Sequence, residues 1–258
     1  MEYLKKHFTT IDASAWSIIR MLILVGFLSA FSTSNFAAEL LVSVAKGLPP
    51  YIIAEQNQGV ELDIVREALA LKGHSIKTVY LPIKRVSSFF EKGKVDAALT
   101  VNESSSLKNA LYSDSYITYQ NVVIGLAERN LKVETLKDLD RYSLIAFQYA
   151  TQYLGKDFAA MAKRNAKYSE RADQKLQISL LFSKRTDLVV MDINIYRYYK
   201  KLETFVDTSH PVSIFKLFTP SNYKVAFRDK AILEDFNEGL RMLRVSGRYQ
   251  EIIRSYIE

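Results

Sequence analysis

The sequence predicts a mixed α/β protein made of two similar lobes that are joined by extended strands. Strand-like and helix-like segments alternate along most of the 258 residues, which favours parallel sheets covered by helices. A helix–turn–strand pattern also occurs twice, about ninety residues apart, which is too far for a solenoid repeat. Hydrophobic residues make up 48% of the chain and charged residues 24%, as in ordinary globular proteins.

The N-terminus has the order of a secretory signal peptide. An uncharged apolar run over residues 21–31 follows Lys5, Lys6 and Arg20, and the segment ends in the small residues Ala37-Ala38. The run is shorter than the ~20 apolar residues of a membrane-spanning helix. We therefore expect residues 1–38 to direct export to the periplasm and to be cleaved after Ala38, with cleavage after Ala37 as an alternative. Retention of the segment as an anchor is a further alternative.

The first half of the remaining chain predicts the order β-α-β-α-β. The elements are strands at 40–44, 75–81 and 95–100 and helices at 61–72 and 84–92. Gly47 and Pro49-Pro50 place a loop after the first strand. Gly73 follows the first helix, where a helix C-terminal glycine is common. This order implies a parallel sheet with covering helices.

A polar, irregular stretch over residues 102–115 precedes a second β/α series. We predict strands at 119–126, 143–147, 187–191 and 223–227, helices at 151–164, 174–182, 193–202 and 230–245, and a final helical turn or two after Gly247. The repeated pattern covers residues 88–99 and 180–191. Coincidence is one explanation, and a pair of similar lobes is the other. We expect lobe 1 over 39–119 and 220–258, and lobe 2 over 120–219.

Composition excludes several kinds of site. The chain has no cysteine and three scattered histidines, so disulfides, thiol catalysis and cysteine or histidine metal sites are not expected. No nucleotide-binding or hydrolase motif is present. We expect no cofactor, no metal and no catalytic activity. The net charge of +7 favours an anionic ligand or a solvated basic surface, but the basic residues are too dispersed for nucleic acid.

Ligands in open α/β sheets bind beyond the carboxyl ends of the strands. This rule directs attention to the segments 48–51, 100–108, 148–153 and 192–194. Tyr51 and Tyr149 are candidates for aromatic ligand contacts, and packing within a lobe is the alternative. Asp192 follows a buried strand and begins a helix. It is a candidate ligand contact or the N-cap of that helix.

Six motifs follow one another in an order that resembles the family 3 extracellular solute-binding proteins, the periplasmic receptors of polar amino-acid transporters. They lie at residues 44–51, 59–64, 93–97, 112–116, 136–147 and 240–249, and the resemblance covers residues 39–258. It implies the type II periplasmic-binding fold, in which a small molecule is captured by hinged closure of two lobes. It also implies an inner-membrane ABC permease or a sensor protein as partner. We expect a monomer.

The resemblance also implies site residues. Thr151 matches a threonine that binds the ligand carboxylate, and Asp192 matches an acid that binds the ligand ammonium group. Thr100 and Asn102 match contacts after the third strand. The family's carboxylate-binding arginine is missing. Lys108 stands in its place when residues are counted forward from Asp96, and Ser106 does when they are counted back from Tyr112.

Lysine binds a carboxylate without the bidentate geometry of arginine. Arg85 in the Pro82-x-x-Arg segment is a further candidate, because helix N-termini favour anions. The predicted ligand contacts are Tyr51, Arg85, Thr100, Asn102, Lys108, Tyr149, Thr151 and Asp192. Two other functions stay open. A periplasmic lyase or dehydratase of this fold would use Glu103 or Lys108 as acid or base, and a ligand sensor would have no transport role.

Overall fold

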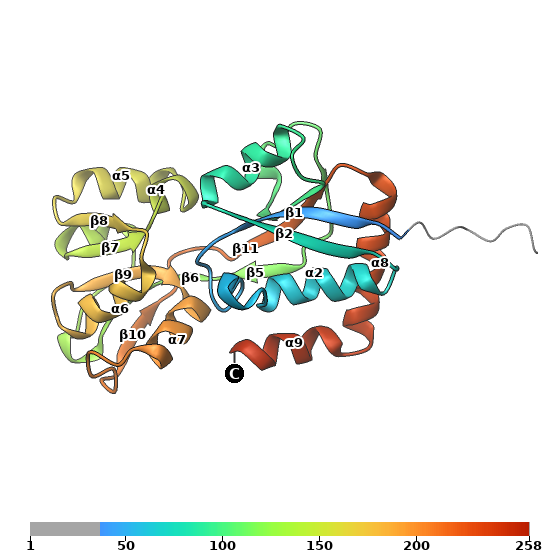
Figure 1. Cartoon of the computed structure of the whole chain (residues 1–258). Helices are drawn as coiled ribbons and strands as arrows, with labels where there is room; N and C mark the ends of the chain where they lie inside the picture. Colours follow the sequence, from blue (N-terminus) through green and yellow to red (C-terminus); the bar gives the residue numbers. More distant parts are fainter. Residues whose placement is uncertain (1–36, 258) are drawn as a thin grey trace, which may run out of the picture. The chain divides into compact units, whose positions relative to one another are not determined.

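Figure 1 shows the computed structural model of the protein, which describes residues 37–257. The expected signal peptide, residues 1–38, lies outside the described residues except for Ala37 and Ala38. The described chain contains two sheets, and helices pack on both faces of each sheet. In the described part, no helix combines the length and the apolar character needed to cross a membrane.

The first sheet has the strand order β2-β1-β3-β11-β4, and β5 pairs with β11. Its strands are β1 (Glu39–Ala45), β2 (Ser75–Leu81), β3 (Ala97–Val101), β4 (Leu111–Tyr112), β5 (Ile117–Tyr119) and β11 (Ser221–Phe227). β1 runs parallel to β2 and β3, whereas β11 is antiparallel to its neighbours. The parallel part of the sheet confirms the β-α-β-α-β order expected from the sequence.

The second sheet has the strand order β10-β6-β9-β7-β8. Its strands are β6 (Asn121–Leu126), β7 (Leu144–Phe147), β8 (Tyr168–Arg171), β9 (Leu188–Asp192) and β10 (Val212–Phe215). β7 is parallel to β8 and β9, and β6 is antiparallel to β9 and β10. β6 and β9 lie in the middle of this sheet and are buried throughout, as expected for strands that are covered on both faces.

The two sheets repeat one arrangement. The order β2-β1-β3-β11 in the first corresponds to β8-β7-β9-β6 in the second. Asp96 precedes β3, and its Oδ2 accepts the N–H of Leu41 at 2.7 Å. Asp187 precedes β9, and its Oδ2 accepts the N–H of Ser143 at 2.9 Å. Each aspartate thus satisfies a backbone donor at the beginning of the neighbouring strand, which confirms that the repeated pattern is structural.

Eight α-helices and four short 3₁₀ helices complete the described chain. The α-helices are α2 (Val60–Ala70), α3 (Ile83–Glu91), α4 (Ala150–Tyr153), α5 (Lys156–Arg164), α6 (Gln174–Phe182), α7 (Ile193–Leu202), α8 (Lys230–Val245) and α9 (Arg248–Ile257). The 3₁₀ helices are η1 (Ala54–Gln56), η2 (Glu103–Ser105), η3 (Ala127–Arg129) and η4 (Leu136–Arg141). Helices α2, α8 and α9 contribute to one core of the first sheet and α3 to the other.

The cores of the second sheet are built in the same way. Helices α4 and α5 contribute to the core on one face, and α6 and α7 to the core on the other. In the first sheet's larger core, α8 approaches α2 closely at Gly239. A Cβ atom on Gly239 would lie 2.0 Å from the carbonyl oxygen of Ala68. Glycine is therefore required where these two helices pack.

The chain passes from the first sheet to the second at Gln120, which separates β5 from β6, and returns between β10 and β11. The Nε2 of Gln120 donates to the carbonyl of Phe218 at 2.9 Å, so the two connections are hydrogen-bonded to each other. The lobe boundaries expected from the sequence, 39–119 with 220–258 and 120–219, stay a prediction.

Several predicted elements differ from the structure. A single helix over 151–164 is wrong, because Gly155, with φ +91°, separates α4 from α5. The strand over 119–126 is interrupted at Gln120, where its two parts join different sheets. β8 and β10 are edge strands that lack a buried apolar run and were not predicted. The C-terminal helix, α9, has 10 residues instead of a turn or two.

Candidate ligand-binding site

A cavity with a volume of about 380 Å³ is lined by residues from both sheets. This volume is within the ~300–1,000 Å³ range of small-ligand pockets. Thr100 of β3, Phe147 of β7 and Asp192 of β9 contribute from the carboxyl ends of their strands, where open α/β sheets bind ligands. The side of α3 adds Ile83 and Ser87. The cavity therefore combines strand ends from the two repeated halves.

The wall of this cavity is aromatic and mostly uncharged. Its aromatic residues are Tyr119, Phe147, Tyr153 and Tyr223, and its amide side chains are Asn102, Asn121, Gln152 and Gln174. Among the described residues that line the cavity, Asp192 is the only Asp, Glu, Lys, Arg or His. No group of three or more His, Asp or Glu in the described part is placed to hold a metal ion. The wall thus offers hydrogen bonds, aromatic surface and one carboxylate.

Of the predicted ligand contacts, the structure brings Thr100, Asn102 and Asp192 together on this wall. The remaining predicted contacts lie elsewhere; these are Tyr51, Arg85, Lys108, Tyr149 and Thr151. Ligand contact by any member of the predicted set stays a prediction.

Asp192 joins several parts of the site although it is only 2% exposed. Its Oδ1 accepts the N–H groups of Asn194 and Ile195 at 2.8 and 3.1 Å, so it is the N-cap of α7. Its Oδ2 accepts the N–H of Gln120 at 2.8 Å, where the chain crosses between the sheets. Burial raises the pKa of Asp192, and these N–H donors offset part of the increase.

Tyr51 is fully buried behind Asp192. Its hydroxyl donates to Oδ1 of Asp192 at 3.0 Å and accepts from Nδ2 of Asn194 at 3.0 Å. Its ring stacks on Tyr119 with the centroids 3.9 Å apart and the planes 17° apart. Burial and the neighbouring Asp192 raise the pKa of Tyr51, so the hydroxyl stays protonated. Tyr51 therefore positions Asp192 and links it to the loop after β1.

A second buried carboxylate, Glu61, lies behind the cavity wall. The hydroxyls of Tyr116 and Tyr119 donate to it, and Oγ1 of Thr100 donates to Oε2 of Glu61 at 2.7 Å. Burial raises the pKa of Glu61, and the three hydroxyl donors offset part of the increase. Because the hydroxyl of Thr100 already donates to Glu61, it can only accept a hydrogen bond from a ligand.

Gly59 fixes the position of Glu61 relative to Tyr51. Its φ of +135° is open mainly to glycine. A Cβ atom there would lie 2.4 Å from the carbonyl oxygen of Tyr51. The N–H of Glu61 donates to that same carbonyl at 3.1 Å. The first turn of α2 is thereby held against the loop that carries Tyr51.

The hydrogen-bond donors of Thr151 are used within the protein. Its N–H and its hydroxyl both donate to Oε1 of Glu170, at 3.0 and 2.9 Å. The N–H of Tyr149 donates to Oε2 of Glu170 at 2.6 Å, and the hydroxyl of Tyr168 donates to Oε1 at 2.9 Å. Burial alone would raise the pKa of Glu170, but these hydrogen bonds outweigh it and lower the pKa. A side chain from β8 thus occupies the donors that were expected to bind a ligand carboxylate.

The basic candidates lie outside the cavity wall. Arg85 and Lys108 are exposed, and the N–H of Lys108 donates to Glu91 at 3.4 Å. The Nζ of Lys84 lies 3.7 Å from the centroid of the Tyr149 ring, a cation–π contact between α3 and the residue before α4. Glu103 is exposed and pairs with Lys224.

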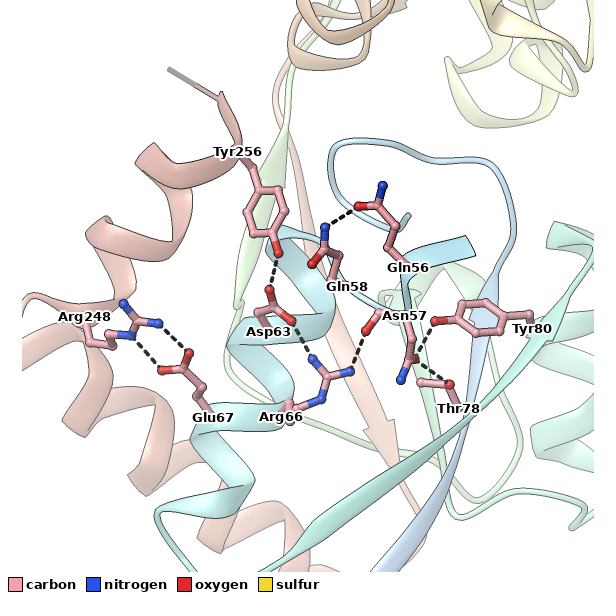
Figure 2. Close-up of polar contacts among 10 residues, drawn as sticks. All are labelled: Gln56, Asn57, Gln58, Asp63, Arg66, Glu67, Thr78, Tyr80, Arg248 and Tyr256. Atoms are coloured by element: carbon pink, nitrogen blue, oxygen red, sulfur yellow. Dashed lines mark hydrogen bonds and ion pairs between the residues drawn. The ribbon is translucent and has the colours of Figure 1, made fainter. Parts of the chain in front are cut away.

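Figure 2 shows that Asp63 and Glu67, the other acidic residues of α2, form polar contacts with Arg66 and with residues of α9. Asp63 accepts from Arg66 and from the hydroxyl of Tyr256 on α9. Glu67 forms two hydrogen bonds with Arg248, at 2.8 and 2.9 Å. Glu61, two residues before Asp63, instead points to the tyrosines behind the cavity. The two carboxylates therefore face different sides of the helix, as their spacing predicts.

Sequence reasoning missed several residues of the site. Tyr119, Asn121 and Tyr223 line the cavity beside the expected lobe boundaries at 119/120 and 219/220, and this position was the available signal. Gln174 also lines it and is 7% exposed, and its Oε1 is buried without a hydrogen-bond partner among the described residues. Nothing in the local sequence distinguishes Gln174 from an ordinary helix residue.

The comparisons with solved structures show proteins of the same fold. An ancestral arginine-binding protein bound to arginine is 20% identical, with a TM-score of 0.67 over 85% of this chain and 98% of that one. An ancestral amino acid-binding protein described as a precursor of cyclohexadienyl dehydratase is 19% identical, with a TM-score of 0.65 over 85% and 96%.

A histidine kinase sensor domain with similarity to periplasmic binding proteins is 16% identical, with a TM-score of 0.69 over 85% of this chain and 96% of that one. No curated protein sequence matches the chain. The family described as bacterial extracellular solute-binding proteins, family 3, matches residues 40–258. The two repeated α/β halves are the architecture expected from the family resemblance, and the family match covers both of them. The chain therefore belongs to family 3 of the bacterial extracellular solute-binding proteins.

Proposed function

We propose that this protein is a solute receptor that holds a small polar ligand, an amino acid or another small organic ion, in the cavity lined by both sheets. The observation that carries the proposal is that Thr100 and Asn102 on one side and Asp192 on the other line one cavity of ligand size. A ligand in this position contacts both halves. It then favours a closed arrangement of the two lobes by its difference in affinity for the open and closed forms.

The proposal places the protein in the periplasm. Residues 1–38 would direct export, and residues 39–119 with 220–258 and 120–219 would form the two lobes. An inner-membrane ABC permease would then recognise the closed form and take up the ligand. Membership of an extracellular solute-binding family and the signal-like order of the N-terminal sequence support this location.

Binding without turnover is the better-supported activity. Glu103 and Lys108, the residues that a lyase of this fold was expected to use, lie outside the cavity wall. Glu103 is paired with Lys224, and Lys108 is exposed. Neither residue is placed to exchange a proton with a molecule in the cavity.

A thermal-shift screen of the exported protein, produced from the full chain, tests the proposal. The library contains amino acids, amines and organic acids. A ligand at about 100 times its dissociation constant should add about 2.7 kcal/mol to the free energy of unfolding. The same ligand should reduce the radius of gyration measured by small-angle X-ray scattering. A library without any stabilising compound would contradict the proposal.

Two neighbouring residues of α3 provide a matched control. Ser87 lines the cavity and Ser88 does not, and both are half-buried. Ser87→Trp should fill the cavity and abolish the ligand-induced shift, whereas Ser88→Trp should retain it. Equal effects of the two variants would place the ligand elsewhere. N-terminal sequencing of the exported protein tests the signal peptide, with Glu39 as the expected first residue.

A further inference from the structure

We propose that the ligand is a small organic cation without a carboxylate group, such as an amine or a substituted ammonium ion. This inference rests on the proposed function and narrows it. Three features of the site carry it. These are the charges on the cavity wall, the groups that already use the anion-binding donors, and the unused acceptors and aromatic surface beside Asp192.

The charge of the wall disfavours a ligand carboxylate. The chain as a whole is basic, with a net charge of +7. Nevertheless, no Lys, Arg or His lines the cavity among the described residues, and Asp192 does. Glu61 lies directly behind Tyr119 and Thr100, which both donate to it. A ligand carboxylate would lose its water and face acidic groups without a compensating cation.

The donors of Thr151 and Tyr149, which were expected to bind an anion, are already used. Both donors of Thr151 and the N–H of Tyr149 bind the carboxylate of Glu170. The amino group of Lys84 lies over the ring of Tyr149, and neither residue lines the cavity. The protein thus supplies its own carboxylate at this place, and a ligand carboxylate has no free donors there.

The wall instead offers what a cation requires. Oδ2 of Asp192 accepts one hydrogen bond from the described residues, that of Gln120, and a carboxylate oxygen can accept a second. Gln174 adds a buried Oε1 that has no hydrogen-bond partner among residues 37–257. The rings of Tyr119 and Tyr223 pack edge to face with centroids 5.0 Å apart, and both line the cavity beside Asp192. Aromatic faces with a carboxylate are the usual surroundings of bound ammonium groups.

Matched pairs of compounds test the inference by isothermal titration of the exported protein. The pairs are agmatine and L-arginine, cadaverine and L-lysine, tyramine and L-tyrosine, and choline and glycine betaine. Each pair keeps the cationic group and differs in the carboxylate. We expect at least one carboxylate-free member to bind at least tenfold more tightly than its partner. Preference for the carboxylate-bearing members overturns this inference and leaves the proposed function intact, whereas no binding by any library compound overturns both.

Two aspartate variants test the role of the charge. Asp192 and Asp229 are N-caps with similar geometry, and Asp229 caps α8 away from the cavity. Asparagine is also a good N-cap, so both substitutions retain capping. Asp192→Asn should weaken binding of the amine at least tenfold, and Asp229→Asn should not change it. Unchanged amine affinity in Asp192→Asn overturns the inference.

Tyr153 provides a decisive variant if Asp192→Asn does not fold. This residue lines the cavity and is 51% exposed, so its replacement does not disturb a core. Tyr153→Leu removes an aromatic face and retains apolar volume. Binding of the amine that is several-fold weaker supports the inference, and unchanged binding overturns it.

Discussion

The hydroxyl of Tyr51 makes the hydrogen bond that connects the loop after β1 with Asp192, 141 residues later in the chain. Tyr51→Phe removes this hydroxyl and keeps the ring that stacks on Tyr119. The substitution removes a single oxygen atom, so the change in the free energy of unfolding mainly reflects the lost hydrogen bonds. A buried hydrogen bond to a charged group contributes about 1.5–3 kcal/mol. The amide of Asn194 also loses an acceptor. We expect the free energy of unfolding to fall by about 2–3 kcal/mol.

Tyr80→Phe is the matched control. Its hydroxyl donates to Oδ1 of Asn57 at 2.7 Å at an exposed site, shown in Figure 2. A neutral hydrogen bond of this kind contributes about 1 kcal/mol or less. Urea unfolding at pH 7 measures both variants, and an unchanged slope indicates that the midpoint reports stability. A cost for Tyr51→Phe no larger than that for Tyr80→Phe would refute the reasoning.

A double-mutant cycle separates this contact from other effects of the substitution. The second variant is Asp192→Ala, which removes the acceptor of the Tyr51 hydroxyl, alone and combined with Tyr51→Phe. Residues in direct contact show coupling energies of about 0.5–3 kcal/mol. We expect a coupling of about 1 kcal/mol or more, because the hydroxyl and the carboxylate bind each other at 3.0 Å. Additive effects of the two substitutions would show that the contact does not contribute.

Two further predictions concern α2. Burial raises the pKa of Glu61 in the folded protein above its ordinary value of 4.5. Protonated Glu61 therefore makes its full contribution to stability below pH 4.5, and this contribution is lost as the pH rises through the pKa of the folded state. Glu61→Gln should therefore reduce the fall in Tm above pH 4.5, and an identical pH profile would contradict this. Gly239→Ala would gain about 1 kcal/mol from helix propensity alone, but the 2.0 Å approach to Ala68 should make it destabilising by about 3 kcal/mol. Stabilisation in urea unfolding would disprove the close contact.

The pattern of the sequence was sufficient for the fold class because that pattern is local. Apolar periodicity located α6, α7 and α8 at their observed bounds. The repeated aspartate turn indicated two similar halves, and Asp96 and Asp187 play equivalent roles in the structure. The strand-end rule directed attention to the segments that contain Thr100, Asn102 and Asp192, and the family resemblance singled out these residues, which line the cavity.

Elements without a local apolar signal could not be found in this way. β8 is a polar edge strand, and its Glu170 determines whether the donors of Thr151 are free. Glu61 looks like an ordinary residue of an amphipathic helix. Its contacts with Tyr116 and Tyr119, which lie 55 and 58 residues later in the chain, are what reveal a buried carboxylate behind the cavity wall.

The sequence by itself determined the fold class, the family and the strand ends that line the cavity, because periodicity and motif order depend on neighbouring residues. The tertiary structure decided the chemistry of the site. A donor or acceptor is available to a ligand only when no residue from elsewhere in the chain has already bound it. Thr151 is bound by Glu170, whereas Oδ2 of Asp192 has room for another donor, and that difference arises only when distant segments meet.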